Sequence, residues 1–277
     1  MKFSLFPPTL VRLLLLIPAG YFFVCAYLFV IQRQKLYYPK VRTEAEMAEG
    51  ARAAGLERWR DPAGTPIGWQ TRDGEGGAPI LIFHGNGGNA LDRVSLIGHL
   101  REAGISQRIH ILDYPGFGSR PGTPKQTNLT AAACAALESM PSPPVVIGES
   151  LGTGVAAQAV SRNPEKVRGV ILLVPFDSMA NAAAFHYPQL PVRYLLLDRY
   201  DSVAALRNFR KPIAVIVAEK DDTTPPEGGL RLFQSLPGPK ELRLIPDAGH
   251  GDTPWMLGPS GWRDIWRFVS DSPLKKQ

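Results

Sequence analysis

VVIGESLGTG, which occupies residues 145–154, sets one serine between two glycines where an apolar run gives way to a helix-compatible one. The residues before Gly148 are apolar and β-branched, as is typical of a buried strand. A serine at a tight strand-to-helix turn projects its hydroxyl into the cleft at the carboxyl edge of a sheet, and flanking glycines leave room for neighbouring segments. The alternative is a passive serine that caps the following helix. The motif alone does not separate the two, so the rest of the chain decides.

Strand-length apolar runs recur along the chain around this turn. Two short extended segments are expected near residues 56–60 and 66–71, followed by the runs PILIF, IHILD, VVIG, VRGVILLV, PIAVIVA and ELRLIP. Most are separated by helix-length segments. Apolar strands that alternate with helices predict a mainly parallel sheet covered by helices on both faces. We therefore expect one α/β domain with an eight-stranded sheet over residues 56–277.

The connection between the sixth and seventh predicted strands is unusually long. It spans about residues 178–211 and is rich in tyrosine, phenylalanine and leucine. Connections of this length exceed a typical crossover. We expect a short apolar cap over the carboxyl edge of the sheet; an irregular helical connection is the alternative.

The N-terminal segment differs in kind from the rest of the chain. Residues 13–31, LLLLIPAGYFFVCAYLFVI, form a run of 19 residues without a charge. As a helix this run is about 28 Å long, close to the hydrocarbon thickness of a bilayer. We predict that residues 1–32 are a tail and a single-pass membrane anchor. The alternative is a cleaved signal peptide, whose apolar region is normally shorter. Basic residues flank the run on both sides and only slightly favour a cytosolic catalytic domain.

Residues 33–55 are predicted to link the anchor to the domain. The stretch QRQKLYYPK, at residues 32–40, is an interfacial collar of basic and tyrosine residues. A short helix should follow, because Thr43 and Glu46 have the spacing of a capping box and Gly55 is a suitable stop.

Composition argues against several other classes of protein. The chain of 277 residues has a net charge of +6, but its basic residues are spread out rather than gathered in a block, so no nucleic acid is expected as a partner. Cys25 and Cys134 belong to no CxxC or Cys/His cluster, so neither a metal nor a cofactor is expected.

A nucleophilic serine needs a base, and the base needs an orienting carboxylate. In this architecture the chain order is serine, acid, histidine. Of the five histidines, His250 follows the last predicted strand, whereas the others precede the serine or lie in the predicted cap. Asp221 and Asp222 follow the seventh strand and Asp177 follows the sixth, and these residues leave the choice of acid open.

Acyl chemistry also needs donors for a developing oxyanion. The backbone N–H of Leu151, directly after the serine, is one candidate. The glycine-rich loop HGNGGN, residues 84–89, is suited to supply a second, for which Asn86 is the expected residue. The same loop also fits the G-x-G-x-x-A pattern of a dinucleotide site, with Asp113 after the next strand. That fingerprint normally follows the first strand of a domain, whereas here two strands come earlier.

Four landmarks occur in order: FHGNGGN, DYPGFG, GESLG and AGHGD. Together they make residues 56–268 resemble the α/β-hydrolase superfamily, and in particular a branch with one N-terminal membrane helix. The resemblance implies that Ser150 is the nucleophile, Asp221 the acid and His250 the base, with Asn86 and Leu151 forming the oxyanion hole. Asp221 is preferred to Asp222 because the family pattern has an aspartate four residues before a proline, here Pro225.

The activity implied by this resemblance is hydrolysis of acyl esters or thioesters, including lipid-derived ones, through an acyl-enzyme and without a metal or cofactor. Two other functions remain open on the sequence. One is a serine peptidase or amidase of the same fold. The other is a non-catalytic protein that binds a ligand, since a fold does not determine function.

Overall fold

The computed structural model describes residues 8–271, so the ends of the predicted tail and domain, residues 1–7 and 272–277, lie outside the described residues. Within residues 8–271, eight strands form the central sheet in the order β10-β9-β8-β7-β4-β6-β3-β2. Strand β3 runs antiparallel to both of its neighbours, β2 and β6, and all other neighbouring pairs are parallel. The predicted mainly parallel, eight-stranded sheet is confirmed. The strands are β2 (Leu56–Arg60), β3 (Pro66–Thr71), β4 (Glu75–Phe83), β6 (Gln107–Leu112), β7 (Val145–Glu149), β8 (Gly169–Leu173), β9 (Ile213–Ala218) and β10 (Lys240–Ile245).

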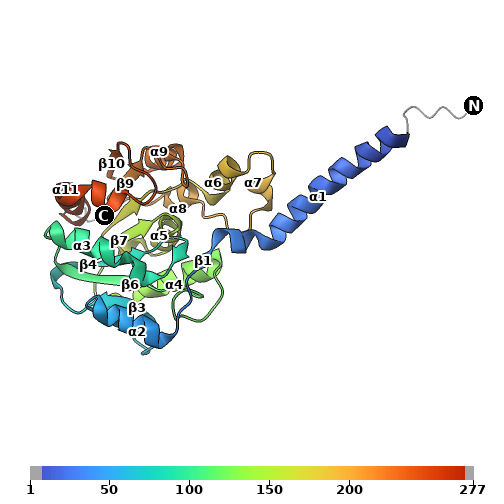
Figure 1. Ribbon diagram of the computed structural model, residues 1–277. Helices are drawn as coiled ribbons and strands as arrows, with labels where there is room; N and C mark the ends of the chain where they lie inside the picture. The colour runs from blue at the N-terminus through green and yellow to red at the C-terminus, as the bar shows by residue number, and fades with distance from the viewer. Residues whose placement is uncertain (1–7, 272–277) are drawn as a thin grey trace, which may run out of the picture.

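Helices cover both faces of this sheet, as Figure 1 shows. Alternate residues of β4 supply two separate cores: Leu81 and Phe83 join one, and Ile80 and Ile82 join the other. Side chains point to opposite faces with a period of two, so each apolar strand serves both layers. The first core is covered by α4 (Gln126–Glu138), α5 (Leu151–Arg162), α8 (Ser202–Leu206) and α9 (Pro226–Ser235). The second is covered by α2 (Glu44–Ala53), α3 (Val94–Glu102), α10 (Thr253–Met256) and α11 (Gly258–Asp271).

The N-terminal helix α1 runs from Pro8 to Leu36 and projects away from the domain (Figure 1). Within the described part of the chain, its residues 15–36 are long and apolar enough to cross a membrane. The helix ends at Leu36, within the predicted collar, and the strand β1 (Tyr38–Pro39) in the same collar pairs with β5 (Gly87–Gly88). Helix α2 begins with the predicted capping box between Thr43 and Glu46. The collar is thus joined to the domain by backbone hydrogen bonds.

The predicted cap at residues 178–211 divides into two parts. Helices α6 (Met179–His186) and α7 (Val192–Leu195) protrude beside the domain end of α1 (Figure 1). The remainder returns to the core, where α8 packs against α5 and Leu206 and Phe209 are buried. We call residues 179–197 the α6–α7 segment.

Candidate active site

Ser150 lies between β7 and α5 in a strained backbone conformation. Its φ of 52° and ψ of −118° are outside the regions that side-chain-bearing residues normally occupy. Such strain costs on the order of 1–3 kcal/mol and persists only where the surrounding structure enforces it. Here the Ser150 N–H donates to the Leu173 carbonyl of β8 at 3.0 Å, and the next residue starts α5. The serine therefore stands at a sharp turn, as the sequence predicts.

The two flanking glycines permit this turn because they carry no side chain. A Cβ on Gly152 would lie 2.0 Å from the carbonyl oxygen of Phe83, and one on Gly148 would lie 2.6 Å from that of Gly152. Both neighbours are backbone atoms that cannot move aside cheaply. Any larger residue would push α5 away from β4 and β7, so the spacing around Ser150 follows from close backbone packing.

Ser150, His250 and Asp221 form a hydrogen-bonded chain. The Ser150 hydroxyl lies 3.0 Å from Nε2 of His250, and Nδ1 of the same ring lies 2.8 Å from Oδ2 of Asp221. Ser150 follows β7, Asp221 follows β9 and His250 follows β10, so the ends of three parallel strands at one edge of the sheet bring the groups together. In the tautomer that suits this geometry, Nδ1–H donates to the carboxylate and Nε2 accepts from the serine.

The two other candidate acids have different partners among the described residues. The Asp222 carboxylate accepts from the Thr223 hydroxyl, and the Asp177 carboxylate accepts from Arg231 Nε at 2.8 Å. Of these three carboxylates, only that of Asp221 forms a hydrogen bond with His250 within residues 8–271.

Asp221 is 5% exposed, and its charge is balanced by donors on every side. Burial raises the pKa of its carboxyl, but hydrogen bonds from His250 and Thr224 lower it more strongly, so the net pKa lies below the usual value. The Thr224 hydroxyl and the backbone N–H groups of Thr223 and Thr224 all donate to it. The carboxylate is therefore ionised at neutral pH and can orient an imidazole that gains a proton.

Leu151 and Asn86 line the same cavity as the serine. Leu151 is the first residue of α5, and the first N–H groups of a helix have no acceptor within it. The loop of Asn86 is held from behind: the Tyr38 N–H donates to the Asn86 carbonyl at 2.9 Å, and Asn86 Nδ2 donates to the Leu36 carbonyl at 3.0 Å. Leu36, the last residue of α1, and Tyr38 thus position the loop expected to carry an oxyanion donor.

His84, the histidine of the FHGNGGN motif, has a supporting place rather than a place in the cavity. It is fully buried, its Nδ1–H donates to the Gly85 carbonyl, and its ring packs against Tyr114 and Phe117. Burial lowers the pKa of His84 to about 3, with a smaller contribution from Arg93. The ring is therefore neutral at physiological pH and stiffens the base of the loop.

Asp113, the acidic residue that a dinucleotide site would need, already has partners within the protein. Asp113 is buried, where it accepts from Trp69 Nε1 at 2.9 Å and pairs with Arg58. Asn89, in the middle of the glycine pattern, caps the short helix that follows. These contacts give both residues structural roles.

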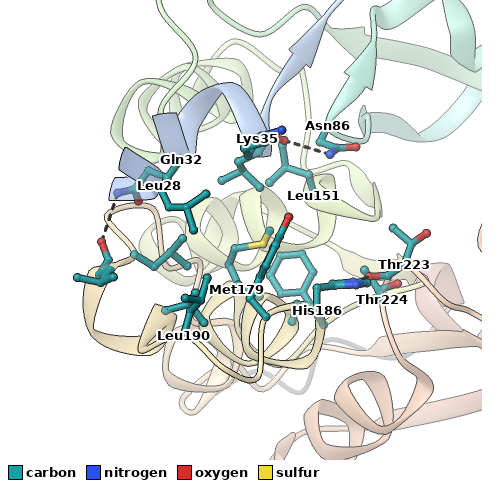
Figure 2. A pocket seen from close by; sticks show the side chains of 18 of the residues that line it. Leu28, Gln32, Lys35, Asn86, Leu151, Met179, His186, Leu190, Thr223 and Thr224 are labelled. Atoms are coloured by element: carbon teal, nitrogen blue, oxygen red, sulfur yellow. Dashed lines mark hydrogen bonds between the residues drawn. The ribbon is translucent and has the colours of Figure 1, made fainter. Parts of the chain in front are cut away.

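The cavity beside Ser150 has a volume of about 260 Å³ and mainly apolar walls. Figure 2 shows Leu28 of α1 on one side, with Met179 and Leu190 of the α6–α7 segment on the other. Sequence reasoning missed the contribution of α1. Its hydropathy predicts a helix, and nothing local to that helix indicates which face meets the domain.

Comparisons with known proteins agree with this architecture. A family model described as the alpha/beta hydrolase fold matches residues 78–206. An uncharacterised protein of Mycobacterium tuberculosis is 33% identical over 237 residues, which cover 78% of this chain and 83% of that protein. The protein bem46 of Schizosaccharomyces pombe is 26% identical over 217 residues, which cover 74% of this chain and 71% of that protein.

Solved structures show the same fold at lower identity. A monoacylglycerol lipase from Paleococcus ferrophilus matches with a TM-score of 0.54 and 19% identity, covering 78% of this chain and 98% of the lipase. A thermophilic esterase from Thermogutta terrifontis matches with a TM-score of 0.55 and 20% identity, covering 78% of this chain and 99% of the esterase. These likenesses confirm the fold predicted from the four landmarks.

Proposed function

Because the chain belongs to the α/β-hydrolase fold family, we propose that it is a serine hydrolase that cleaves acyl esters or thioesters. The observation that carries the proposal is the continuous chain from Ser150 through His250 to Asp221, with distances of 3.0 and 2.8 Å. Hydrogen-bonded nucleophile, base and orienting acid are the signature of covalent acyl transfer. The proposed substrate is an ester whose acyl part enters the apolar cavity.

The proposed reaction has two halves. His250 Nε2 accepts the proton of Ser150 as its Oγ attacks the acyl carbonyl, and the backbone N–H groups of Leu151 and Asn86 hold the oxyanion. The tetrahedral intermediate collapses, His250 gives its proton to the leaving alkoxide or thiolate, and an acyl-serine remains. Water, activated by the same imidazole, then releases the acid and restores Ser150. Asp221 stays ionised throughout.

In this proposal α1 is a single-pass membrane anchor. Its support is the apolar length of residues 15–36 together with exposed side chains such as Phe22, Phe23 and Val30. Full-length protein should remain in the membrane fraction through a carbonate wash. A mature chain that starts near residues 26–30 would instead support a cleaved signal peptide.

The test of the catalytic proposal is labelling with a fluorophosphonate probe, which reacts with activated serines. Wild-type protein should be labelled, and Ser150→Ala should not. Ser161→Ala is the matched control, because Ser161 lies on the same helix α5 but its hydroxyl donates to the Gln158 carbonyl away from the triad. Wild-type protein that stays unlabelled and hydrolyses no p-nitrophenyl ester would favour a non-catalytic binding role. Casein cleavage that depends on Ser150 would favour a peptidase.

A further inference from the structure

One face of α1 forms a wall of the cavity that holds Ser150. The residues of this face are Cys25, Leu28, Phe29, Gln32, Lys35 and Leu36. Their spacing of three or four residues places them in one stripe of the helix. The opposite face, which carries Tyr27 and Val30, is exposed. A helix with the composition of a membrane span therefore lines the cavity of Ser150 with one of its faces.

Hydrogen bonds hold α1 against the α6–α7 segment at two positions along the helix axis. Tyr21 Oη donates to the Gln189 carbonyl at 3.0 Å, and Gln32 both donates to the Leu195 carbonyl and accepts from the Leu197 N–H. Tyr21 and Gln32 are 11 residues apart, so the contact extends about 16 Å along the helix. This length is several turns, which is enough to fix the orientation of the stripe.

A second set of contacts fixes the end of α1 to the domain. Arg33 pairs with the buried carboxylate of Asp198 at 3.0 Å. The Tyr37 hydroxyl lies 3.1 Å from the same carboxylate and 3.0 Å from the hydroxyl of Tyr200. Tyr37 is 4% exposed, so this junction is part of the core. The direction in which α1 leaves the domain is consequently set by packed side chains.

The contacts of Tyr21, Gln32 and Arg33 lie within the stretch of α1 that can cross a membrane, residues 15–36. With α1 in a bilayer, the α6–α7 segment lies at the level of the lipid. Exposed side chains that do not line the cavity suit that place: Phe185, Tyr194 and Leu197. Exposed apolar clusters mark membrane contacts, and tyrosines favour the interface. Irregular backbone is excluded from hydrocarbon unless protein covers it, so the segment fits the interface with α1 beside it.

We infer that the cavity opens to the bilayer between α1 and the α6–α7 segment and takes one acyl chain of a membrane-resident ester or thioester directly from the leaflet. This inference rests on the proposed hydrolase function and names its substrate class. The carbonyl lies at Ser150, and the chain occupies the cavity that Leu36, Cys25, Leu28 and Leu190 line. Figure 2 shows Leu28 and Leu190 on the walls of this cavity. The occupant is an acyl chain because the cavity joins the nucleophile at one end to the lipid-facing helix at the other.

The test uses full-length protein in phosphatidylcholine vesicles and compares Leu28→Trp with Val30→Trp. Leu28 is on the cavity stripe, whereas Val30 is 78% exposed on the other face, so the two variants place the same side chain on opposite faces of α1. Leu28→Trp should lower kcat/KM for p-nitrophenyl palmitate at least 10-fold relative to p-nitrophenyl acetate. Val30→Trp should keep the wild-type ratio. Hydrolysis of acetate and labelling of Ser150 report that the triad is intact in each variant.

A second measurement tests where the substrate comes from. At fixed bulk concentration, the palmitate ester is diluted with increasing amounts of vesicle lipid. Uptake from the leaflet predicts that the rate follows the mole fraction of substrate in the membrane. A rate that follows bulk concentration, or equal palmitate-to-acetate ratios in both variants, overturns the inference while leaving the hydrolase proposal intact. Absence of any Ser150-dependent hydrolysis in wild-type protein overturns the proposed function itself.

Discussion

The proposed triad lies at the ends of three parallel strands of a buried sheet, β7, β9 and β10, whereas one wall of the cavity belongs to a helix that leaves the domain. Around Ser150 the backbones of β4, β7 and α5 pack so closely that Gly148 and Gly152 have no room for a side chain. Along α1 the contacts are a few side-chain hydrogen bonds and one buried junction at Tyr37. In this protein the reacting groups are fixed by the core, and the groups that would select a substrate belong to a peripheral element. Changes to the two regions should therefore have separable effects.

The largest expected effect is loss of the triad. Ser150→Ala or His250→Ala should lower hydrolysis of p-nitrophenyl acetate by at least roughly 10³-fold, because only binding and oxyanion stabilisation then remain. Asp221→Asn should be severely impaired, since the amide cannot stabilise the protonated imidazole. Asp222→Asn is the matched control and should be mild, because Asp222 contacts Thr223 rather than His250. If Asp222→Asn were the inactive variant, the choice of acid would be wrong.

The second prediction asks where the domain begins. A chain that starts at Arg33 keeps Tyr37, β1 and the hydrogen bonds from Tyr38 and Lys40 to the loop of Asn86, whereas one that starts at Thr43 loses them. Loss of one buried aromatic side chain and its hydrogen bonds should lower the free energy of unfolding by about 3–5 kcal/mol. Hydrolysis of acetate should fall about 10-fold or more, because the oxyanion loop loses its support. Urea unfolding and ester assays on both chains check this. Equal stability would place the boundary after the collar.

The same contrast explains what the sequence predicts well. GESLG is a local pattern, because a Cβ on Gly148 would lie 2.6 Å from the carbonyl oxygen of Gly152, four residues later. The alternation of apolar runs likewise specifies a sheet buried on both faces. The capping box at Thr43 depends on residues three positions apart. Such features are readable because their physical causes lie within a few residues of them.

Other features depend on long-range pairing. Asp221 and Asp222 are neighbours in one turn, and only the position of His250, which comes from a different strand end, separates them. The cavity face of α1 depends on contacts with Gln189 and Leu195 of the α6–α7 segment, more than 150 positions away. Tyr37 resembles an interfacial tyrosine in the sequence, and its burial follows from Asp198 and Tyr200. The spacing of hydrophobic residues along the sequence does not predict such long-range contacts.

A third prediction concerns the buried histidine behind the oxyanion loop. Burial lowers the pKa of His84 to about 3. Between pH 6.5 and 3, His84 is therefore protonated in the unfolded chain and neutral in the folded chain. Stability should therefore fall with decreasing pH by up to about 1.4 kcal/mol per pH unit. His110, with a pKa lowered by burial to about 4, acts in the same direction, while Asp113, with a pKa raised by burial to about 6, acts oppositely and roughly cancels it.

Urea unfolding between pH 6 and 4.5 tests this sign. Wild-type protein should lose stability over that range, and His84→Asn should show a much flatter dependence, because asparagine does not titrate. His99→Asn, at a partly exposed position of α3, is the control and should follow the wild-type curve. An equal pH dependence of the free energy of unfolding in wild type and His84→Asn would contradict the prediction, because it would show that His84 has the same pKa in the folded and unfolded states.

The smallest expected effect is a loss of stability at the junction of α1 without a loss of catalysis at the triad. Tyr37→Phe removes one buried hydroxyl that lies between Asp198 and Tyr200, and should lower the free energy of unfolding by about 1–2 kcal/mol. Tyr38→Phe is the matched control at the next residue. Its hydroxyl donates to the Lys35 carbonyl from an exposed side chain, so its effect should stay within about 0.5 kcal/mol. Both variants should hydrolyse p-nitrophenyl acetate like wild type, because neither side chain touches the triad. A loss of acetate hydrolysis in Tyr37→Phe at full occupancy of the folded state would show that the junction also positions the reacting groups, and the division between the two regions would no longer hold.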